Sequence, residues 1–308
     1  MIIVTGGAGF IGSNLVHGLN SLGRDDIIVV DTLMNAKKHL NLSGARFIDY
    51  FDKDEIIDAI DSLKPVEAVF HQGACTVTTE QDGRYMMRTN YTFSRDLLHE
   101  CLRLEIPFIY ASSAAVYGTG DKPFAEADNE RPLNIYGFSK LAFDQHVRCI
   151  LSRARSPVVG LRYFNVYGPG EVHKGNMASL VQRMFEQHRA GRPLNLFQGS
   201  KNFRRDFIHV SDVVKVNFHF FERKKSGIFN CGTGSARSFQ ELGDLVAEQF
   251  GGAAIEIVDM PPQLEAQYQK YTCSDNSMLN LSGYKGGFVA LEDGVKSYIE
   301  AMNQQRQQ

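Results

Sequence analysis

The sequence of 308 residues lacks the features that define several protein classes. Its five cysteines are odd in number and widely spaced, which argues against a disulfide framework or a metal site and indicates a reducing compartment. The net charge of −2 gives no reason to expect nucleic acid or an anionic membrane as a partner. No apolar run is long enough to span a membrane, and because the first residues already resemble a strand we expect no signal peptide.

What is present is the composition of a soluble globular enzyme, with 43% hydrophobic and 22% charged residues. We find no internal repeat, low-complexity segment or flexible linker in the sequence. The length is sufficient for one large domain and a smaller one.

The N-terminal residues combine a strand, a glycine-rich turn and the start of a helix. Residues 1–5 form a short apolar run typical of a buried strand, and residues 13–19 have helical periodicity. Between them lie Gly6, Gly9 and Gly12. In a dinucleotide site the first glycine would make the turn, the second would let the phosphates approach, and the third would let helix and strand pack closely. A tight turn of any purpose also needs glycine, so this motif alone is weak evidence.

A second apolar strand, at residues 27–30, ends in Asp31. An acid about 20 residues beyond such a glycine turn can hydrogen-bond the ribose of a dinucleotide. A solvated aspartate at the end of a strand is the alternative. Strand, glycines, strand and acid in this order favour the dinucleotide site.

The N-terminal half alternates strands and helices in the manner of a parallel α/β sheet. Further strands are expected at 46–49, 66–71, 107–112 and 158–162, and helices at 54–63, 84–104 and from about 136 to 152. Beyond residue 164 the pattern fades into glycine, proline and polar loops, until residues 226–231 resemble a return to the sheet. We therefore predict an α/β fold, a Rossmann-type doubly wound parallel sheet formed by residues 1–165 plus about 208–235. A smaller mixed α/β substrate-binding domain would comprise about 166–207 plus 236–308.

Tyr136 and Lys140 lie one helical turn apart within the run YGFSK, so a helix places them on the same face. A nearby positive charge favours the phenolate, which brings a tyrosine of ordinary pKa about 10 toward the range of a proton-transfer catalyst. Ser113 follows the strand at 107–112, where a doubly wound sheet binds ligands, and could hold a substrate hydroxyl. The alternatives are a half-buried tyrosine above a surface lysine, and a small residue that eases a turn.

Together, the glycine turn, Asp31, Ser113, Tyr136 and Lys140 resemble the extended short-chain dehydrogenase/reductase family, in its nucleotide-sugar-modifying branch. The similarity spans nearly the whole chain and includes the runs NVYGP, which begins at Asn165, and RDFIHVSD. Dehydratases of this branch carry an Asp-Glu pair directly after the serine. Two alanines occupy those positions here, so we do not expect a dehydratase.

Further runs, among them EVHKGNMAS and FQGS, resemble the members of the branch that act on an ADP-linked heptose. The resemblance implies an isomerase that inverts carbon 6 of ADP-D-glycero-D-manno-heptose by transient oxidation, with the hydride stored on tightly bound NADP. Tyr136 and Lys174 would be opposing acid/base groups, Lys140 would bind the nicotinamide ribose and lower the pKa of Tyr136, and Ser113 would orient the reacting oxygen. It also implies a cytoplasmic homo-oligomer, a pentamer, that supplies lipopolysaccharide core biosynthesis.

The same resemblance assigns residues to the two ligands. Cofactor positions would be Gly6, Gly9, Phe10, Ile11, Gly12, Asp31, Thr32, Lys38, Lys53, Gln72, Gly73, Ala74, Cys75, Thr76, Asn90, Lys140 and Val166. Substrate positions would be Ser113, Asn165, Asn176, Arg183, Phe197, Gln198, Gly199, Ser200, Arg205 and Tyr268. An arginine suits a diphosphate because its fork donates two parallel charge-assisted bonds. Asp31 alone would favour NAD, but Lys37 and Lys38 could neutralise a 2′-phosphate, and the resemblance favours NADP.

Two other functions stay open at this point. A UDP-sugar 4-epimerase of the same family would share Ser113, Tyr136 and Lys140 but would not need Lys174, because its keto-sugar swings past a single tyrosine. A non-catalytic dinucleotide-binding regulator could use the same fold, although a sensor need not keep all three residues.

Overall fold

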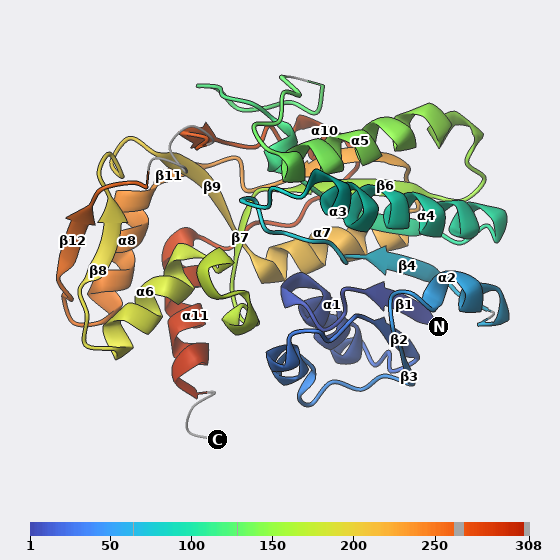
Figure 1. The fold of residues 1–308 in the computed structure, drawn as a ribbon, viewed down its shortest axis with the longest axis horizontal. Coiled ribbons are helices and arrows are strands. Elements are labelled where there is room, and N and C mark those ends of the chain that lie inside the picture. The colour runs from blue at the N-terminus through green and yellow to red at the C-terminus, as the bar shows by residue number, and fades with distance from the viewer. Residues whose placement is uncertain (64, 128, 262–267, 305–308) are drawn as a thin grey trace.

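The computed structural model describes residues 1–63, 65–127, 129–261 and 268–304. Figure 1 shows a larger layered part built on one sheet and, beside it, a smaller group of helices and short strands. The sheet is parallel, with the strand order β10-β6-β5-β4-β1-β2-β3. Its strands are β1 (Ile2–Thr5), β2 (Ile27–Val30), β3 (Asp49–Phe51), β4 (Ala68–His71), β5 (Phe108–Ser113), β6 (Val158–Tyr163) and β10 (Gly227–Cys231).

Helices cover both faces of this sheet (Figure 1). Apolar side chains project from both faces of the strands and pack against these helices. Ile2 of β1 packs with α1 (Phe10–Ser21) and α7 (Val210–Arg223). Its neighbour Ile3 points to the opposite face, because successive side chains of a strand alternate. There the core includes residues of α2 (Ile56–Ala59), α4 (Phe93–Arg103) and α5 (Ile135–Ile150). Burial on both faces explains why these strands are continuous apolar runs.

The order of the strands reverses between β1 and β4, which are hydrogen-bonded neighbours at the centre of the sheet. From β1 the chain builds outward through β2 and β3 on one side, and from β4 through β5 and β6 on the other. After β1 the chain leads to α1 on one face of the sheet, and after β4 it leads to α4 on the other. Ligands of such sheets bind at this point of reversal. The predicted doubly wound parallel fold is confirmed.

The smaller part has a hydrophobic core of its own, which includes Met184, Leu242 and Tyr298. Its helices are α6 (Leu180–Arg189), α8 (Phe239–Gln249) and α11 (Leu291–Gln304). Its strands are β7 (Asn165–Tyr167), β8 (Leu194–Phe197), β9 (Arg204–His209), β11 (Ala236–Ser238), β12 (Ile255–Val258) and β13 (Tyr271–Thr272). Leu279 of α10 (Ser277–Leu281) packs instead in the core of the larger part. The boundaries of the two predicted domains stay a prediction.

Several expected elements differ in the structure. The helix expected at 54–63 is the four-residue α2 followed by the 3-10 turn η2 (Ile60–Ser62). The third strand begins at Asp49 and not at residue 46. Arg46 lies outside the ladder, and its backbone N–H donates to Oδ1 of Asn20 on α1 at 2.8 Å. The expected helix at 84–104 is interrupted: α3 (Gly83–Met87) and α4 are joined by a π-helical turn, η3 (Arg88–Thr92). Such π turns often accompany functional sites.

Helix α7 was also not predicted, although Val210, Val213, Val214 and Phe220 recur at helical spacing on its buried face. The remaining short helices are η1 (Ala36–Leu42), η4 (Ala114–Val116), η5 (Leu151–Arg153) and η6 (Val172–Met177). Of these, η1 and η6 border the site described below.

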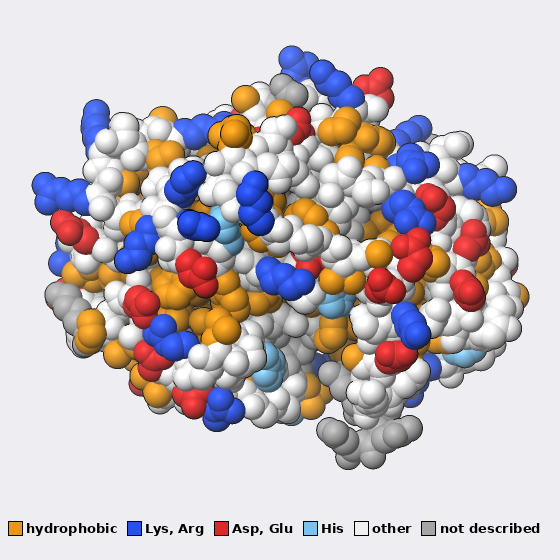
Figure 2. Space-filling model, turned by 180° about the vertical axis from the view of Figure 1, so that it is seen from behind, with side chains coloured by type: hydrophobic (Ala, Val, Ile, Leu, Met, Phe, Trp, Pro, Cys, Tyr) orange, Lys and Arg blue, Asp and Glu red, His pale blue; other side chains and the backbone are white. Residues whose placement is uncertain are grey.

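Positive and negative side chains are interspersed on the face shown in Figure 2, in keeping with the small net charge. Within the described ranges, no helix is both long and apolar enough to cross a membrane.

Candidate active site

The glycine turn after β1 brings backbone against backbone. Gly6 has a φ of 63°, in the left-handed region, and a Cβ atom on it would lie 2.6 Å from the backbone nitrogen of Gly73. A Cβ atom on Gly12 would lie 2.1 Å from the carbonyl oxygen of Gly6. Helix α1 begins directly after Gly9, whose position has no capping side chain. The N–H groups of the first turn therefore remain available to an anion.

Asp31 connects the end of β2 to this turn. Its carboxylate accepts hydrogen bonds from the backbone N–H groups of Ala8 at 3.1 Å and Thr32 at 2.8 Å. Nζ of Lys38 lies 2.8 Å from Oδ1 of Asp31, and only 4% of Asp31 is exposed. The negative charge of Asp31 is thus balanced by a lysine of η1.

A cavity of about 480 Å³ lies along the loops that follow β1, β2 and β4. This volume is in the range of small-molecule sites. The predicted cofactor residues that line it are Gly6, Gly9, Phe10, Ile11, Gly12, Asp31, Thr32, Lys38, Lys53, Gln72, Gly73, Ala74, Cys75 and Thr76.

A larger cavity, of about 640 Å³, adjoins the first and extends into the smaller part of the molecule. The predicted residues that line it are Ser113, Tyr136, Lys140, Asn165, Val166, Lys174, Asn176, Arg183, Phe197, Ser200, Arg205 and Tyr268. Lys174 lines both cavities, as do Phe10 and Gln72. The structure therefore brings together residues that are far apart in the sequence.

Three predicted residues do not line either cavity. Asn90, in the π-helical turn, is 1% exposed; its side chain accepts from the backbone N–H of Cys75 at 2.8 Å and donates to the Cys75 carbonyl at 2.9 Å. The Asn90 side chain thus holds the loop after β4, which lines the first cavity. Gln198 and Gly199 lie in the turn after β8, where the backbone N–H of Gln198 donates to Val258 at 2.8 Å.

Tyr136 and Ser113 meet where β5 ends and α5 begins. Asn134 caps α5 by accepting from the backbone N–H of Gly137 at 2.9 Å. Burial raises the pKa of Tyr136, and a hydrogen bond with Ser113 acts in the opposite direction. Both side chains line the same cavity.

Lys140 is only 4% exposed, and its Nζ donates to the carbonyl oxygen of Ala111 at 2.8 Å. Burial lowers its pKa to about 8, against a smaller opposing effect of the Asp144 carboxylate. The influences resolved on the pKa of Tyr136 are burial, Ser113 and Cys75. A lowering of that pKa by Lys140 stays a prediction.

Lys174 lies in η6, in the loop that leads from β7 to α6. Its Nζ is 5.2 Å from the centroid of the Phe10 ring and 3.8 Å from Oε2 of Glu171. The Glu171 side chain is fully buried and accepts from the backbone N–H groups of Gly168 at 3.2 Å and Ser179 at 2.6 Å. A second amine thus faces the cavity that contains Tyr136.

Two arginines, the buried Arg205 and the half-buried Arg183, line the larger cavity without carboxylate partners among the described residues. Arg205 stacks against Phe239 and Tyr268, at 5.5 and 5.0 Å from the ring centroids, and burial lowers its pKa. Burial also lowers the pKa of Arg183, whose Nε is buried without a hydrogen-bond partner. Neither arginine forms an ion pair with a carboxylate in the part of the chain that the structure describes. Unpaired cations of this kind favour an anionic ligand.

Some cavity residues gave no sequence signal. Gln187 on α6, Asn195 on β8 and Phe239 on α8 line the larger cavity, and Oδ1 of Asn195 is buried without a partner. They come from the region in which the alternation of strands and helices fades, so nothing in the pattern marks them.

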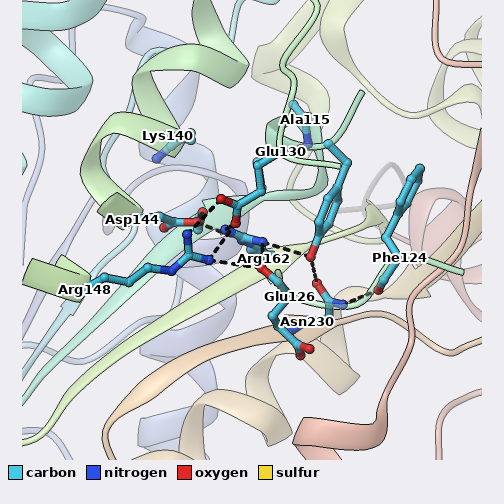
Figure 3. Close-up of polar contacts among 12 residues, drawn as sticks. Ala115, Phe124, Glu126, Glu130, Lys140, Asp144, Arg148, Arg162 and Asn230 are labelled. Carbon is cyan, nitrogen blue, oxygen red and sulfur yellow. Dashed lines mark hydrogen bonds and ion pairs between the residues drawn. The ribbon is translucent and has the colours of Figure 1, made fainter. Parts of the chain in front are cut away.

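A buried network of ion pairs and hydrogen bonds joins α5 to β6 (Figure 3). Arg162 of β6 is fully buried; its Nε lies 2.8 Å from Oδ2 of Asp144, and it also pairs with Glu130. Nη1 of Arg162 donates to the hydroxyl of Tyr117 at 3.0 Å. Asp144 lies one turn beyond Lys140 on α5. The network therefore ties the helix that carries Tyr136 and Lys140 to the sheet.

We expect Arg162→Met to destabilise the fold, since it leaves the Asp144 carboxylate buried without its cation. Loss of one partner of a buried pair costs about 3–5 kcal/mol. Urea unfolding measures the change. The control is Arg155→Met: Arg155 forms an exposed pair with Glu105 at 3.4 Å, a kind worth about 0–1 kcal/mol. Equal, small losses in both variants would contradict the role given to Arg162.

Comparison with known proteins identifies the class that this fold and site define. Residues 2–232 match the model of the NAD dependent epimerase/dehydratase family. The chain belongs to this family, and the family predicted from the sequence is confirmed.

Individual proteins are similar to the chain over nearly its full length. The chain is 52% identical to ADP-L-glycero-D-manno-heptose-6-epimerase of Brachyspira hyodysenteriae, over 98% of each chain. Its structure is similar to that of the Helicobacter pylori enzyme of the same name, with a TM-score of 0.88 and 32% identity, over 98% of this chain and 96% of that one. It is also similar to UDP-glucose 4-epimerase of Thermotoga maritima, with a TM-score of 0.87 and 28% identity over 99% of each chain.

Proposed function

We propose that the protein is an epimerase that inverts carbon 6 of the heptose in ADP-D-glycero-D-manno-heptose to give the L-glycero epimer. The observation that carries the proposal is the presence of two acid/base groups, Tyr136 and Lys174, in one cavity that adjoins a dinucleotide cavity. The relative from Brachyspira, which is 52% identical over nearly the full length, bears the corresponding name.

The chemistry of an inversion explains the need for two groups. When the substrate hydroxyl is oxidised, a base must take its proton; when the ketone is reduced from the opposite face, an acid must protonate the new alkoxide. Tyr136 would serve one epimer, with Ser113 orienting the oxygen, and Lys174 would serve the other. A bound nicotinamide supplies the hydride acceptor and donor.

Lys140 would hold the nicotinamide ribose. Its buried ammonium already donates to the carbonyl of Ala111 at 2.8 Å, so its position does not depend on a ligand. Its pKa of about 8 keeps it largely protonated at neutral pH. It can therefore act as a fixed positive charge beside Tyr136, which favours the phenolate.

The first cavity fits a dinucleotide. The uncapped start of α1 offers N–H groups to a pyrophosphate, and Nε2 of Gln72 is a buried donor without a protein partner. Lys38 and Lys53 line the same cavity. Since Lys38 balances Asp31, the carboxylate repels a 2′-phosphate less than an unpaired one would. We therefore infer NADP as the cofactor.

Arg183 and Arg205 would bind the diphosphate of the sugar nucleotide. Arg205 is buried and Arg183 half-buried, and neither has a paired carboxylate among the described residues. An arginine fork matches phosphate oxygens. The ADP-heptose would then lie with its diphosphate in the smaller part of the molecule and its heptose beside Tyr136 and Lys174. The protein is further inferred to work as a homo-oligomer, a pentamer by family resemblance, in the cytoplasm.

The direct test is incubation of the purified protein with ADP-D-glycero-D-manno-heptose, followed by chromatographic separation of the C6 epimers. We expect interconversion, and a reduction in turnover of about 10²–10⁴-fold in both Lys174→Ala and Tyr136→Phe, because each loses a proton-transfer group. Lys296→Ala, at an exposed position of α11, serves as the matched control.

Three results would contradict this proposal. The first is no interconversion by the wild-type protein; the second is interconversion of UDP-glucose and UDP-galactose instead, which indicates a 4-epimerase. The third, full turnover of Lys174→Ala, would remove Lys174 from the mechanism.

The cofactor is tested separately by releasing it from the purified protein and identifying it by mass spectrometry, with NADP expected. Lys38→Ala leaves Asp31 without its counter-charge, so we expect the preference for NADP over NAD to fall about tenfold, or 1.4 kcal/mol. Lys37→Ala is the control, because Lys37 is exposed and does not line the cavity. Release of mainly NAD from the wild type would disprove the inference.

A further inference from the structure

The loop that carries Lys174 has an irregular backbone. It contains Gly170 and Gly175, whose φ angles of 102° and 53° lie in the region that favours glycine. The turn of η6 is not continuous through Gly175. The backbone N–H of Lys174 donates to the carbonyl oxygen of Glu171 at 2.8 Å, and Glu171 closes the loop through Gly168 and Ser179. The position of the loop relative to the cofactor side depends in addition on contacts with the rest of the molecule.

Three asparagines of the cofactor side supply such contacts. Nδ2 of Asn14 donates to the carbonyl oxygen of Pro169 at 2.8 Å, and Nδ2 of Asn35 donates to that of His173 at 3.0 Å. Nδ2 of Asn41 lies 3.1 Å from both the carbonyl oxygen of Gly170 and Nδ1 of His173. The side-chain amides of these asparagines thus hold the backbone at Pro169 and Gly170 and at His173, the residue before Lys174.

These asparagines lie on the two segments that border the dinucleotide cavity. Asn14 is in the first turns of α1, directly after the glycine turn, and its Nδ2 also donates to Phe10 at 2.9 Å. Asn35 caps η1 by accepting from the backbone N–H of Lys37 at 3.1 Å. Asn41, near the other end of η1, also contacts the carbonyl oxygen of Ala8 in the glycine turn at 3.0 Å.

The same segments contact the cofactor residues. Between Asn35 and Asn41 lies Lys38, which pairs with Asp31 at 2.8 Å. Phe10, whose ring lies under Nζ of Lys174, lines both cavities. Nδ1 of His173 lies 3.1 Å from Nδ2 of Asn41. Burial and the charges of Lys38 and Lys174 lower the pKa of His173 to about 4.

We propose that Asn14, Asn35 and Asn41 are positioning residues that hold the Lys174 loop at a fixed position beside the dinucleotide cavity. This inference rests on the proposed function, in which Lys174 is the second acid/base group. The three side chains link the segments proposed to bind the cofactor to the loop of Lys174. In the proposed mechanism, Lys174 exchanges a proton on the opposite side of the reacting carbon from Tyr136. A misplacement of about 1 Å at such a group can lower the rate by about 10²-fold.

The test uses Asn41→Ala in the full-length protein with its cofactor bound. We expect kcat to fall about 10- to 100-fold while KM for the ADP-heptose changes less than about twofold, because Asn41 acts on Lys174 and not on the substrate. In single turnovers, hydride transfer from the epimer that uses Lys174 should slow more than that from the epimer that uses Tyr136.

A double-variant cycle separates positioning from a general structural effect. If Asn41 acts through Lys174, then Asn41→Ala should cost little further turnover in a Lys174→Ala background. A loss that is the same in both backgrounds, or equal slowing of both epimers, would overturn the proposal. Should Asn41→Ala fold poorly, Asn35→Ala allows the same measurements, since Asn35 is exposed.

Asn20→Ala is the matched control. Asn20 is also on α1, and its Nδ2 donates to the carbonyl oxygens of Arg24 and Arg46, each at 2.8 Å, without contact to the Lys174 loop. Its turnover should match that of the wild type. A drop as large as that of Asn41→Ala would contradict a specific role for the three asparagines.

Hydrogen exchange gives a readout that does not require activity. In Asn41→Ala, amide exchange of residues 170–177 should increase at least about tenfold, because the loop opens more readily, whereas Asn20→Ala should leave it unchanged. Unaltered exchange in Asn41→Ala would disprove the anchoring even if the enzyme epimerises ADP-heptose. Increased exchange in a protein that does not epimerise would instead retain the anchoring and refute the proposed function.

Discussion

The close approach of backbone segments at the centre of the sheet is the constraint on which the rest of the site depends. Gly6 lies against Gly73, and Gly12 lies against Gly6, at distances that leave no room for a Cβ atom. This contact lets the loops after β1 and β4 meet at the point where the strand order reverses. The start of α1, the carboxylate of Asp31 and the loop braced by Asn90 all take their positions from it.

Three arginines with little exposure, Arg162, Arg183 and Arg205, differ in whether a carboxylate pairs with them. Arg162 is paired with Asp144 and Glu130 and serves the architecture, since it ties α5 to the sheet. Arg205 is buried and Arg183 half-buried with its Nε atom buried; both line the larger cavity without a paired carboxylate among the described residues. Because a buried charge is costly unless it is paired, these two arginines favour an anionic ligand. Charge pairing within the fold thus separates Arg162, whose role is structural, from the two arginines proposed to bind the ligand.

Local patterns explain why much of the fold was predictable. The strand at Ile2, the glycine turn and the helix after it form one short segment, so their order and spacing are visible in the sequence. The spacing of Tyr136 and Lys140 likewise follows from one turn of a helix. The start of β3 at Asp49 was not predictable, because it is set by pairing with β2, in which Asp49 lies opposite Ile28. Neither was the π turn at Asn90, whose side chain bonds to the Cys75 loop.

By itself, the sequence determined the class of fold, the place of the dinucleotide turn and the identity of the Tyr136–Lys140 pair, because each depends on neighbours within one or two turns of chain. Only the tertiary structure decided which residues share a cavity. It brought Lys174 beside Phe10, left Gln198 and Gly199 outside the cavity lining, and anchored the Lys174 loop to η1. These contacts join residues more than a hundred positions apart, and no local pattern records such pairings because they arise from the packing of whole elements.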